Sequence, residues 1–427
     1  MMDRFAAAKP GTPLKWLFLD LNSYFASVEQ HLRPALRHRP VAVVPVMSRS
    51  TCVIAASYEA KVFGVKTGTP VWEALQRCPG LVLVQAQHER YVALHHRIIE
   101  VVDQYLPVSQ VCSIDEMACE LMGRERDPAQ AVALAQQIKQ GIAQQVGETL
   151  RCSIGIAPNR FLAKVASDMQ KPNGLVVLPA EHLQERLSRL SVTDLPGVGY
   201  HMAHRLHRAG VDTLPQLWAL TPQQMRQLWG SVVGERFWYA LHGQEIAETR
   251  TEIDQKSISH SHVMAPALRE PVQSRWVARR LLVKAASRLR RLGYFTASLS
   301  LSLRLEAGPR YRQDERFMPT QDTFSLLQTL DRLWEALSGV FQNRRIKKVS
   351  LVLGRLQAEG TLSLNLFAQD PHQLVQRQTS LSRLMDQLNA RYGRDTLMVG
   401  LMPKLRQPDV GTKVAFDRIP HLAEFYE

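Results

Sequence analysis

Hydrophobic positions in the N-terminal part of the chain, up to position 180, switch between short continuous runs and helical spacing. The apolar run Trp16–Leu19 predicts a strand, and Phe25, Val28 and Leu32 share one face of the helix predicted to follow it. Similar runs predict strands at 40–46, 51–57, 81–86 and 150–158, and a strand–turn–strand at 109–122. Helical spacing predicts helices at 58–80 (with a glycine turn inside), 88–107 and 129–146. Strands that alternate with helices in this way predict an α/β core.

The pattern changes after position 180. Residues 181–245 have helical spacing throughout. A long amphipathic helix at about 271–292, an alternating strand at 294–307, a helix near 323–341 and a closing strand at 345–357 predict a separate α+β domain. Residues 358–427 contain one further predicted helix, near 373–392, and we interpret them as a C-terminal tail. The fold class expected is therefore a multidomain protein with α/β and α+β parts.

Charge is concentrated in one part of the chain. The net charge is +14, and residues 251–357 carry 19 Lys and Arg against 9 Asp and Glu, which leaves only +4 for the rest of the chain. A basic module attached to a nearly neutral body most often binds nucleic acid. A generally basic, solvated surface is the alternative that charge alone leaves open.

Composition excludes several classes of protein. The chain has no run of about 18 apolar residues, so we expect no membrane span. The N-terminal segment 1–16 lacks the apolar stretch of a secretory signal, and the five cysteines form no CxxC pair. We therefore expect a cytoplasmic protein with reduced thiols and no membrane partner.

Three carboxylates stand where chemistry is expected. Asp20 ends the first predicted strand, and Asp115 and Glu116 are adjacent within an apolar stretch, "CSIDEMACEL". Three hard oxygen ligands suit Mg²⁺ or Mn²⁺ better than zinc. Neighbours on an ideal strand point to opposite faces, so both acids can face one metal cluster only if the strand is twisted or ends there. For Asp20, a helix N-cap is the alternative.

Five motifs occur together along residues 14–357. They are "LFLDLNSYFASVEQ", "SYEAKVFGVKTGTP", "SIDEMACEL", "CSIGIAPNRFLAKVASDMQKPNG" and "LPGVGYHMAHRL". In order and spacing they resemble the Y-family translesion DNA polymerases, with the bacterial DinB and UmuC branches both matching. The resemblance implies a right-hand polymerase with an N-terminal extension (1–13), palm (14–23 and 87–178), fingers (24–86), a thumb with a helix–hairpin–helix (179–245), a DNA-binding little finger (254–357) and the tail.

The resemblance implies a role for each carboxylate. Asp20, Asp115 and Glu116 match the family's catalytic acids, and these three with the Leu21 carbonyl match its ligands for two Mg²⁺ ions, for which Mn²⁺ can substitute. Asn22 stands where many members carry a second Asp, so we do not count it as a ligand.

The resemblance also implies a nucleotide site, formed by Tyr24, Phe25, Tyr58, Lys61 and Lys171. Phe25 matches the steric gate that leaves no room for a ribose 2′-hydroxyl, and without the motif it would be interpreted as a core residue. A phenol and two ammonium groups can neutralise triphosphate charge. Solvent exposure is the alternative for both lysines. Lys61 replaces an Arg common in the DinB branch and so loses a bidentate fork.

Contacts with DNA and with a clamp are expected at three places. Gly197 and Gly199 fit the hairpin of a helix–hairpin–helix, where small residues let the backbone approach a phosphate. The little finger's basic helix supplies Arg275, Arg279 and Lys284, which would bind phosphates without reading sequence. In "LSLNLF" (362–367), Leu364, Leu366 and Phe367 resemble a sliding-clamp-binding peptide, although Ser363 replaces the usual Gln and a packed strand is the alternative.

Two functions are compatible with these residues. The first is a template-directed, low-fidelity DNA polymerase without proofreading, acting in DNA damage tolerance, with primer–template DNA, dNTP, a sliding clamp and a UmuD-like regulatory subunit as partners. The second is a polymerase-shaped scaffold without chemistry that bridges DNA, clamp and other mutagenesis factors. Because all three acids are present, the sequence favours the enzyme.

Overall fold

A computed structural model describes residues 12–49, 51–246, 256–342, 344–361, 371–393 and 396–400, together with 414 and 419–425. The chain forms two compact units. Unit 1 comprises Met1–Glu248 and Thr412–Phe425, and unit 2 contains Thr249–Gly411. These two units divide the chain more coarsely than the expected palm, fingers, thumb and little finger, so those boundaries remain predictions.

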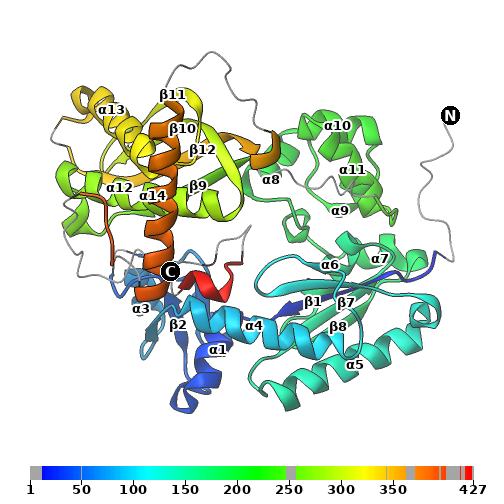
Figure 1. The fold of residues 1–427 in the computed structure, drawn as a ribbon. Coiled ribbons are helices and arrows are strands. Elements are labelled where there is room, and N and C mark those ends of the chain that lie inside the picture. Colours follow the sequence, from blue (N-terminus) through cyan, green and yellow to red (C-terminus); the bar gives the residue numbers. More distant parts are fainter. Residues whose placement is uncertain are drawn as a thin grey trace. The chain divides into compact units, whose positions relative to one another are not determined.

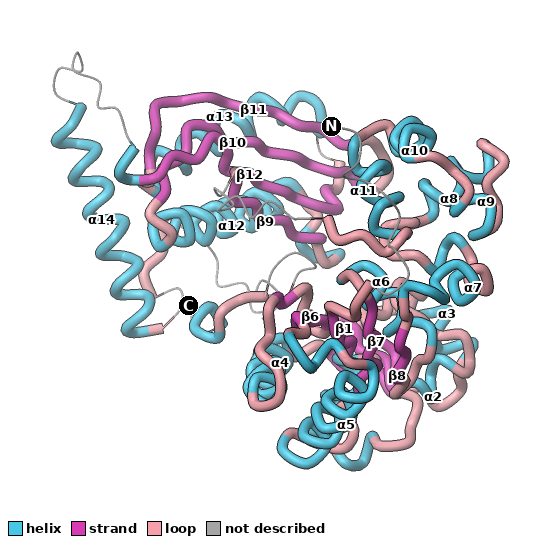
Figure 2. Tube along the Cα trace, turned by 90° about the vertical axis from the view of Figure 1, so that its right-hand side faces the viewer, coloured by secondary structure: helices cyan, strands magenta, loops and turns pink. Residues whose placement is uncertain are grey.

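The centre of unit 1 is a five-stranded sheet in the order β5-β6-β1-β7-β8 (Figures 1 and 2). Its strands are β1 (Trp16–Leu21), β5 (Gln110–Val111), β6 (Glu116–Glu120), β7 (Cys152–Ala157) and β8 (Leu175–Val177). Helices α4 (His88–Asp103) and α5 (Pro128–Gln145) cover one face, where Leu17 and Leu19 enter the core. Helix α6 (Arg160–Met169) covers the other face, where Phe18 and Ala118 point.

Close approach of α6 to the sheet depends on Gly155 in the middle of β7. A Cβ at this position would lie 2.0 Å from the carbonyl oxygen of Ala163 and 2.3 Å from the nitrogen of Ser167. Only glycine therefore allows α6 to pack this tightly. The contact fixes α6 above the ends of β1 and β6.

A second, smaller sheet in unit 1 has the order β3-β2-β4. It is formed by β2 (Val41–Val44), β3 (Ala55–Ala56) and β4 (Val82–Gln85), and the helices around it are α1 (Tyr24–Leu32), α2 (Tyr58–Lys61) and α3 (Val71–Arg77). The residue before α1 is Ser23, in a left-handed conformation and without a side-chain cap. Asp20 is therefore not the N-cap of this helix, which removes the alternative considered for it.

Residues 183–241 are mainly helical, as predicted, with turns and one short 3-10 helix (Val192–Asp194) between α7 and α8. They form α7 (Leu183–Leu187), α8 (Tyr200–Arg208), α9 (Leu214–Trp218), α10 (Pro222–Trp229) and α11 (Val232–Leu241). Thr213, Thr221 and Ser231 accept hydrogen bonds from backbone N–H groups at the starts of α9, α10 and α11. These caps explain why short helices follow one another here.

Unit 2 is an antiparallel sheet covered on one face by helices (Figure 2). The strand order is β11-β10-β12-β9, formed by β9 (Ser257–Val263), β10 (Tyr294–Leu305), β11 (Arg310–Thr320) and β12 (Ile346–Ala358). Helices α12 (Pro271–Arg291) and α13 (Thr323–Phe341) bury the leucines of β10 and β12. The sheet's other face carries polar side chains.

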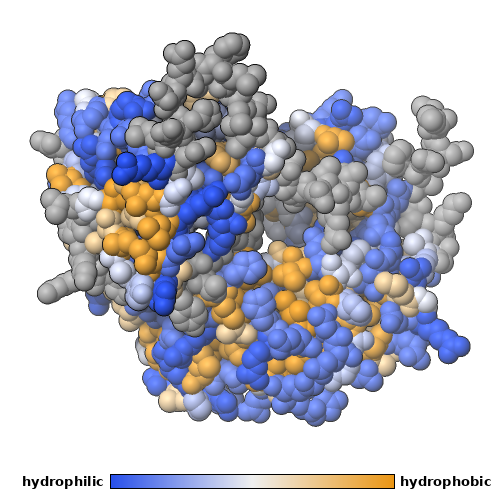
Figure 3. All heavy atoms as spheres, in the orientation of Figure 1, coloured by the Kyte–Doolittle hydropathy of each residue, from blue (hydrophilic) through white to orange (hydrophobic). Residues whose placement is uncertain are grey.

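The predicted helix of the tail is α14 (Pro371–Tyr392), which packs on α12 and α13. Arg290 of α12 forms an ion pair with Asp386 of α14 at 2.7 Å. Figure 3 shows apolar side chains gathered over the region of α12 and α14, where Leu381 and Leu384 are 46% and 49% exposed. The tail therefore adds a helix to unit 2.

The end of the chain returns to unit 1. Ile419 and Phe425 pack against its hydrophobic core, and the Val414 N–H donates to His88 Nδ1 of α4 at 3.4 Å. All five cysteines are free, as expected. In the part of the chain that the structure describes, no helix is both long and apolar enough to cross a membrane.

Candidate active site

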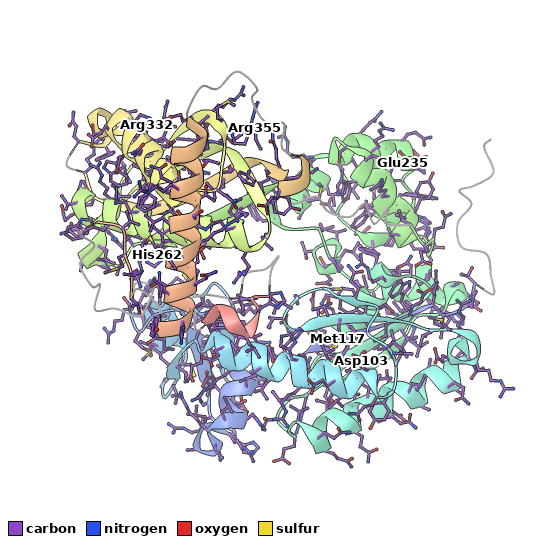
Figure 4. All side chains as sticks on the ribbon, in the orientation of Figure 1. Asp103, Met117, Glu235, His262, Arg332 and Arg355 are labelled. Atoms are coloured by element: carbon purple, nitrogen blue, oxygen red, sulfur yellow. The ribbon has the colours of Figure 1, made fainter. Side chains whose placement is uncertain are left out.

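The site is built where β1 ends and β6 begins. These strands are antiparallel, and their register places Asp20 directly opposite Glu116. Both residues fall on the same side of the sheet as Phe18 and Ala118, which is the side that α6 covers. Met117, labelled in Figure 4, points to the opposite face and is fully buried in the core. Strand pairing alone therefore brings two of the three predicted acids together.

Asp115 lies in the turn just before β6 and joins the same end of the sheet. Its carbonyl accepts from the Leu21 N–H at 2.8 Å, and Ser113 Oγ donates to its carboxylate at 2.6 Å. The strand begins at Glu116, so the expectation that 115 and 116 depart from ideal alternation is confirmed. Burial raises the pKa of Asp115, the Ser113 hydrogen bond opposes this, and nearby Asp20 and Glu116 raise it further.

A largely buried lysine of α6, Lys164, contacts two of the three acids. Lys164 Nζ lies 2.5 Å from Asp20 Oδ2, 2.8 Å from Glu116 Oε1 and 3.2 Å from Asp168, four residues along the same helix. Burial disfavours the charged ammonium, but the three carboxylates outweigh it and raise the pKa of Lys164. Neither Lys164 nor Asp168 was identified from the sequence, although both lie inside a motif that was.

The predicted phosphate-binding residues gather beside the acids. Lys171 Nζ lies 2.7 Å from Asp20 Oδ2 and 2.7 Å from Asp168 Oδ1. Burial works against the charge of Lys171, yet Asp20 and Asp168 raise its pKa. Lys61 Nζ lies 4.3 Å from the centre of the Tyr58 ring, and Tyr58 in turn lies within electrostatic reach of Lys171 and Asp20. The structure thus brings Tyr58 and Lys61, both on α2, together with Lys171, which lies far away in the sequence.

Phe25 is partly buried against the core of unit 1. Its ring stacks on Tyr91 at 4.3 Å between centroids and meets His88 edge-on at 6.0 Å. The Tyr24 hydroxyl donates to the backbone carbonyl of Tyr91 at 2.7 Å, and Tyr24 is 3% exposed. The Tyr24 side chain therefore belongs to the core, and a nucleotide contact by residue 24 remains a prediction.

Asn22 has a structural role. Its Nδ2 donates to Ser153 Oγ at 3.0 Å, and its Oδ1 accepts from the Asn173 N–H at 2.7 Å. These bonds connect β1 to β7 and to the segment that carries Lys171. The side chain is occupied in holding the site together, in agreement with our not counting it as a ligand.

The donor set fits hard divalent cations. Asp20 and Glu116 share a single cationic group, and Asp115 lies close enough for its pKa to respond to both. Carboxylate oxygens are the ligands that Mg²⁺ and Mn²⁺ prefer. Within the described part of the chain, no three acidic, His or Cys side chains already converge as a formed metal centre. A cation would therefore need side-chain adjustment around Lys164.

The hairpin before α8 has the geometry expected of a helix–hairpin–helix. The Val198 N–H donates to the Leu195 carbonyl at 3.0 Å, and Gly197 has φ +90°, which favours glycine. Gly199 precedes α8 with an ordinary φ of −81°, and a Cβ there would meet nothing within 4 Å. The fold therefore requires glycine at 197 but leaves room for a side chain at 199.

The predicted DNA-binding arginines of α12 are ion-paired within unit 2. Arg275 contacts Asp331 at 3.1 Å and Glu335 at 2.7 Å, and Arg279 contacts Asp331 at 2.5 Å. These pairs join α12 to α13. Binding of DNA by Arg275, Arg279 and Lys284 remains a prediction, but the first two have a structural role that the sequence did not reveal.

Sequence reasoning missed the outer face of the unit 2 sheet. The register places Arg304 of β10 between Arg310 of β11 and Lys348 of β12. Like charges directly across a sheet destabilise it, so such a row favours an anionic ligand. Serines occupy the same face, namely Ser257, Ser259, Ser261, Ser298, Ser300, Ser302 and Ser350. The strict Ser–apolar alternation in "SLSLSLRL" was the available signal.

The clamp-like peptide, with Leu364, Leu366 and Phe367, lies outside the described residues.

Sequence models of known families match three parts of the chain. The impB/mucB/samB family matches residues 19–168, and the C-terminal domain of the same family matches residues 255–366. The thumb domain of DNA polymerase iota matches residues 193–245. The first match contains all three acids, and the third contains the glycine hairpin.

Curated relatives and solved structures agree with these matches. DNA polymerase IV of Alkalilimnicola ehrlichii is 32% identical over 68% of this chain and 81% of its own, and that of Moorella thermoacetica is 31% identical over 88% and 93%. A Y-family polymerase chimera of Dbh and Dpo4 shares the fold, with a TM-score of 0.68 and 23% identity over 81% of this chain and 99% of its own. An insertion ternary complex of Dbh DNA polymerase gives a TM-score of 0.54 at 23% identity, covering 80% and 98%. The chain therefore belongs to the Y family of DNA polymerases, as a bacterial DinB-like, DNA-directed enzyme of the translesion type.

Proposed function

We propose that the chain adds deoxynucleotides to a primer 3′-hydroxyl opposite damaged template bases, with two divalent cations held by Asp20, Asp115, Glu116 and the Leu21 carbonyl. Mg²⁺ is the cation we expect, with Mn²⁺ as a substitute. The observation that carries the proposal is the meeting of these acids with Lys61, Lys171 and Tyr58 at one end of the sheet. When bound, the ions would supply activation of the hydroxyl and stabilisation of the leaving pyrophosphate.

The basic residues would bind the incoming nucleotide. Lys171 and Lys61 would neutralise the triphosphate, and the Tyr58 hydroxyl would donate a hydrogen bond to it. Lys171 now contacts Asp20, so triphosphate binding would exchange a carboxylate for a phosphate partner. The Phe25 ring, held by Tyr91, would exclude a ribose 2′-hydroxyl. The two lysines and Tyr58 would thus bind the triphosphate, and Phe25 would select the sugar.

DNA would be held by phosphate contacts from both units. We place one set on the outer face of the unit 2 sheet, where Arg304, Arg310 and Lys348 form the basic row and the serines offer hydroxyl donors. The other is the hairpin at Gly197 and Gly199, whose backbone N–H groups precede α8. Neither set reads base edges, which suits an enzyme that accepts many sequences.

We also propose two protein partners and a role in DNA repair. The peptide 362–367 would bind a sliding clamp and compensate for low processivity. A regulatory subunit of the UmuD kind is a second proposed partner. Action in cytoplasmic DNA repair and damage tolerance, with low fidelity and no proofreading, completes the proposed role. Loss of clamp binding in a Leu366→Ala, Phe367→Ala double variant is the direct test of the first partner.

Primer extension tests the chemistry. Asp115→Asn and Glu116→Gln should each lower extension of a primed template by about a thousandfold, the loss typical when charge stabilisation of a transition state is removed. The matched control is Asp103→Asn, at the end of α4 (Figure 4), where the carboxylate accepts from the Val108 N–H. Extension that survives either active-site change would overturn the assignment.

The same assay distinguishes the enzyme from the scaffold. A scaffold would bind primed DNA and clamp but incorporate no nucleotide with Mg²⁺ or Mn²⁺. Retention of the acids together with the phosphate-binding residues favours incorporation by the wild-type protein.

A further inference from the structure

Lys164 occupies a position that neither strand pairing nor phosphate binding explains. It is 19% exposed at the side chain, and its ammonium contacts Asp20 and Glu116 at the same time, at 2.5 and 2.8 Å. Those two carboxylates are opposite each other in the β1–β6 register, so they would repel each other without a cation between them. Lys164 supplies that cation from the protein itself.

Asp168 is an alternative ion-pair partner for the Lys164 ammonium. It lies one turn further along α6, 3.2 Å from Lys164 Nζ, and is 32% exposed. It is not among the predicted metal ligands. The long, flexible lysine side chain can shift between the strand carboxylates and Asp168 on its own helix, while the helix remains fixed by its contact with Gly155. Lys164 therefore has one set of partners in the metal-binding acids and another outside them.

We propose that Lys164 and Asp168 act as a built-in counter-ion switch that sets the affinity of the site for divalent cations. Lys164 neutralises Asp20 and Glu116 before metal binds, and it moves onto Asp168 when a cation takes those carboxylates. This inference rests on the proposed function, in which Asp20 and Glu116 are metal ligands. Lys164 and Asp168 are positioning residues in this scheme.

The switch predicts opposite effects for its two members. Lys164→Met removes the ammonium that competes with the metal for Asp20 and Glu116. It should tighten metal binding by about tenfold, which corresponds to a weak interaction between two charges a few ångströms apart at a protein surface. Asp168→Asn removes the alternative partner, keeps Lys164 on the ligands, and should weaken metal binding by about threefold. In the Lys164→Met background, Asp168→Asn should have no further effect, because the two residues act through one contact.

Mn²⁺ binding to the full-length protein, without DNA or nucleotide, is the readout. Free Mn²⁺ is measured by electron paramagnetic resonance during titration. Lys61→Met is the matched control: it also removes a cation of the site, but one that stacks on Tyr58 rather than pairing with Asp20 and Glu116. It should change Mn²⁺ affinity less than about twofold if contact, and not overall charge, is responsible. An equal effect of Lys61→Met and Lys164→Met would overturn the switch.

Lys171 also contacts Asp168, so its contribution must be separated. The effect of Asp168→Asn should persist in a Lys171→Met background. If it disappears there instead, Lys171 is the residue that Asp168 controls, and the proposal for Lys164 is wrong.

Thermal unfolding provides a second measurement. In a chelating buffer, Lys164→Met should melt at a lower temperature than wild type, because the two facing carboxylates lose the cation that they share and only Asp20 keeps one, Lys171. Mn²⁺ should then raise its melting temperature by more than it raises that of the wild type, in proportion to tighter binding. A smaller rise than in the wild type contradicts the proposal.

Failure of the switch and failure of the proposed function give different results. If Asp20→Asn abolishes Mn²⁺ binding while Lys164→Met leaves affinity unchanged or weaker, the metal site stands and the switch is wrong. If Asp20→Asn binds Mn²⁺ as well as wild type does, the metal assignment itself is wrong.

Discussion

The Phe25 ring is held in place by a chain of contacts that ends at a buried carboxylate. Phe25 stacks on Tyr91, and the Tyr91 hydroxyl donates to Glu29 Oε1 at 2.7 Å. Glu29 is fully buried, with Arg33 3.6 Å away. A gate ring needs such support, because a site that is loose by about 1 Å loses its selectivity.

Shortening the gate should therefore change sugar selection. Phe25→Ala opens space beside the nucleotide sugar, and we expect ribonucleotide incorporation to rise relative to deoxynucleotide incorporation by on the order of a hundredfold. Single-nucleotide insertion with matched dNTP and rNTP measures the ratio. Glu29→Gln, which keeps the shape but weakens the hydrogen bond from Tyr91, should raise the same ratio to a lesser extent. An unchanged ratio in Phe25→Ala would show that another residue excludes the ribose.

His95 links the stability of unit 1 to pH. It is 1% exposed on α4, and its Nδ1 is buried without a hydrogen-bond partner in the described structure. Burial lowers the pKa of His95 to about 4, with like charge on His96 adding to the effect and a hydrogen bond to Ile114 opposing it. The unfolded chain takes up a proton near the usual pKa of about 6.5, before the folded protein does. The folded state therefore loses stability as pH falls from about 6.5 to 4.

The expected loss is about 3 kcal/mol across that window, since each pKa unit corresponds to about 1.4 kcal/mol. Urea unfolding at several pH values between 7 and 4 should show the wild type losing this much more stability than His95→Asn. The difference between the two proteins cancels the contributions of other groups. Parallel stability curves for the two proteins would contradict the assignment.

At the scale of elements, two glycine substitutions in the hairpin before α8 should separate an effect on stability from an effect on DNA binding. Gly197→Ala forces a side chain into φ +90° and should destabilise unit 1 by about 1 kcal/mol. Gly199→Ser places a good N-cap residue where there is room, so stability should stay the same or rise by about 0.5 kcal/mol. If the hairpin contacts DNA, Gly199→Ser should still weaken DNA binding, as measured by fluorescence anisotropy. Unchanged affinity would place the contact elsewhere.

Elements with one buried face could be predicted from the sequence, and elements without one could not. Helices α5 and α13, each with one buried face, were predicted almost to their observed ends, because their apolar positions follow the helical period. Strand β1 is buried on both faces, and its continuous apolar run predicted it. The edge strands β9 and β11 were missed. Their side chains are mostly polar on the outer face, and β11 is largely exposed along its length. Their pairing with β12 and β10 is what makes them strands, and this depends on distant residues.

The site was predictable to the same degree. Asp20, Asp115 and Glu116 end or begin strands, which periodicity can reveal, and a motif supplied Lys171. Lys164 could not be assigned a role, because its partners in β1 and β6 meet it across a sheet–helix packing that Gly155 makes possible. Asp168 could not be assigned one either, because its role depends on Lys164 and Lys171. Similarly, ion pairs between α12 and α13 cannot be seen from the charge of α12 alone.

At the scale of the whole molecule, the basic charge of residues 251–357 divides into two groups. Some arginines form ion pairs within unit 2, as Arg332 does with Glu315 (Figure 4). Others form the row of Arg304, Arg310 and Lys348 across the outer sheet face. Only the second group is arranged so that the cations face each other, and a polyanion would relieve that repulsion.

Removing part of this row should change the salt dependence of DNA binding. The Arg304→Ala, Arg310→Ala double variant should lower affinity and reduce the slope of log affinity against log salt by about 2, since each phosphate contact contributes about 0.9. The loss should be similar for different DNA sequences. Arg332→Ala is the matched control and should leave the slope unchanged. Equal slopes for the double variant and the wild type would remove the sheet face from the DNA-binding surface.

The backbone joins unit 2 to unit 1 at both ends of unit 2. The chain leaves unit 1 near residue 248 and returns to it at 412, where Ile419 and Phe425 anchor its end on the core. Unit 2 is thus an insertion, fastened by covalent links at both of its ends. A single protease cut between the units would open one link and leave the fragments associated through the docked end. Release of unit 2 would require a second cut, or loss of those two apolar anchors.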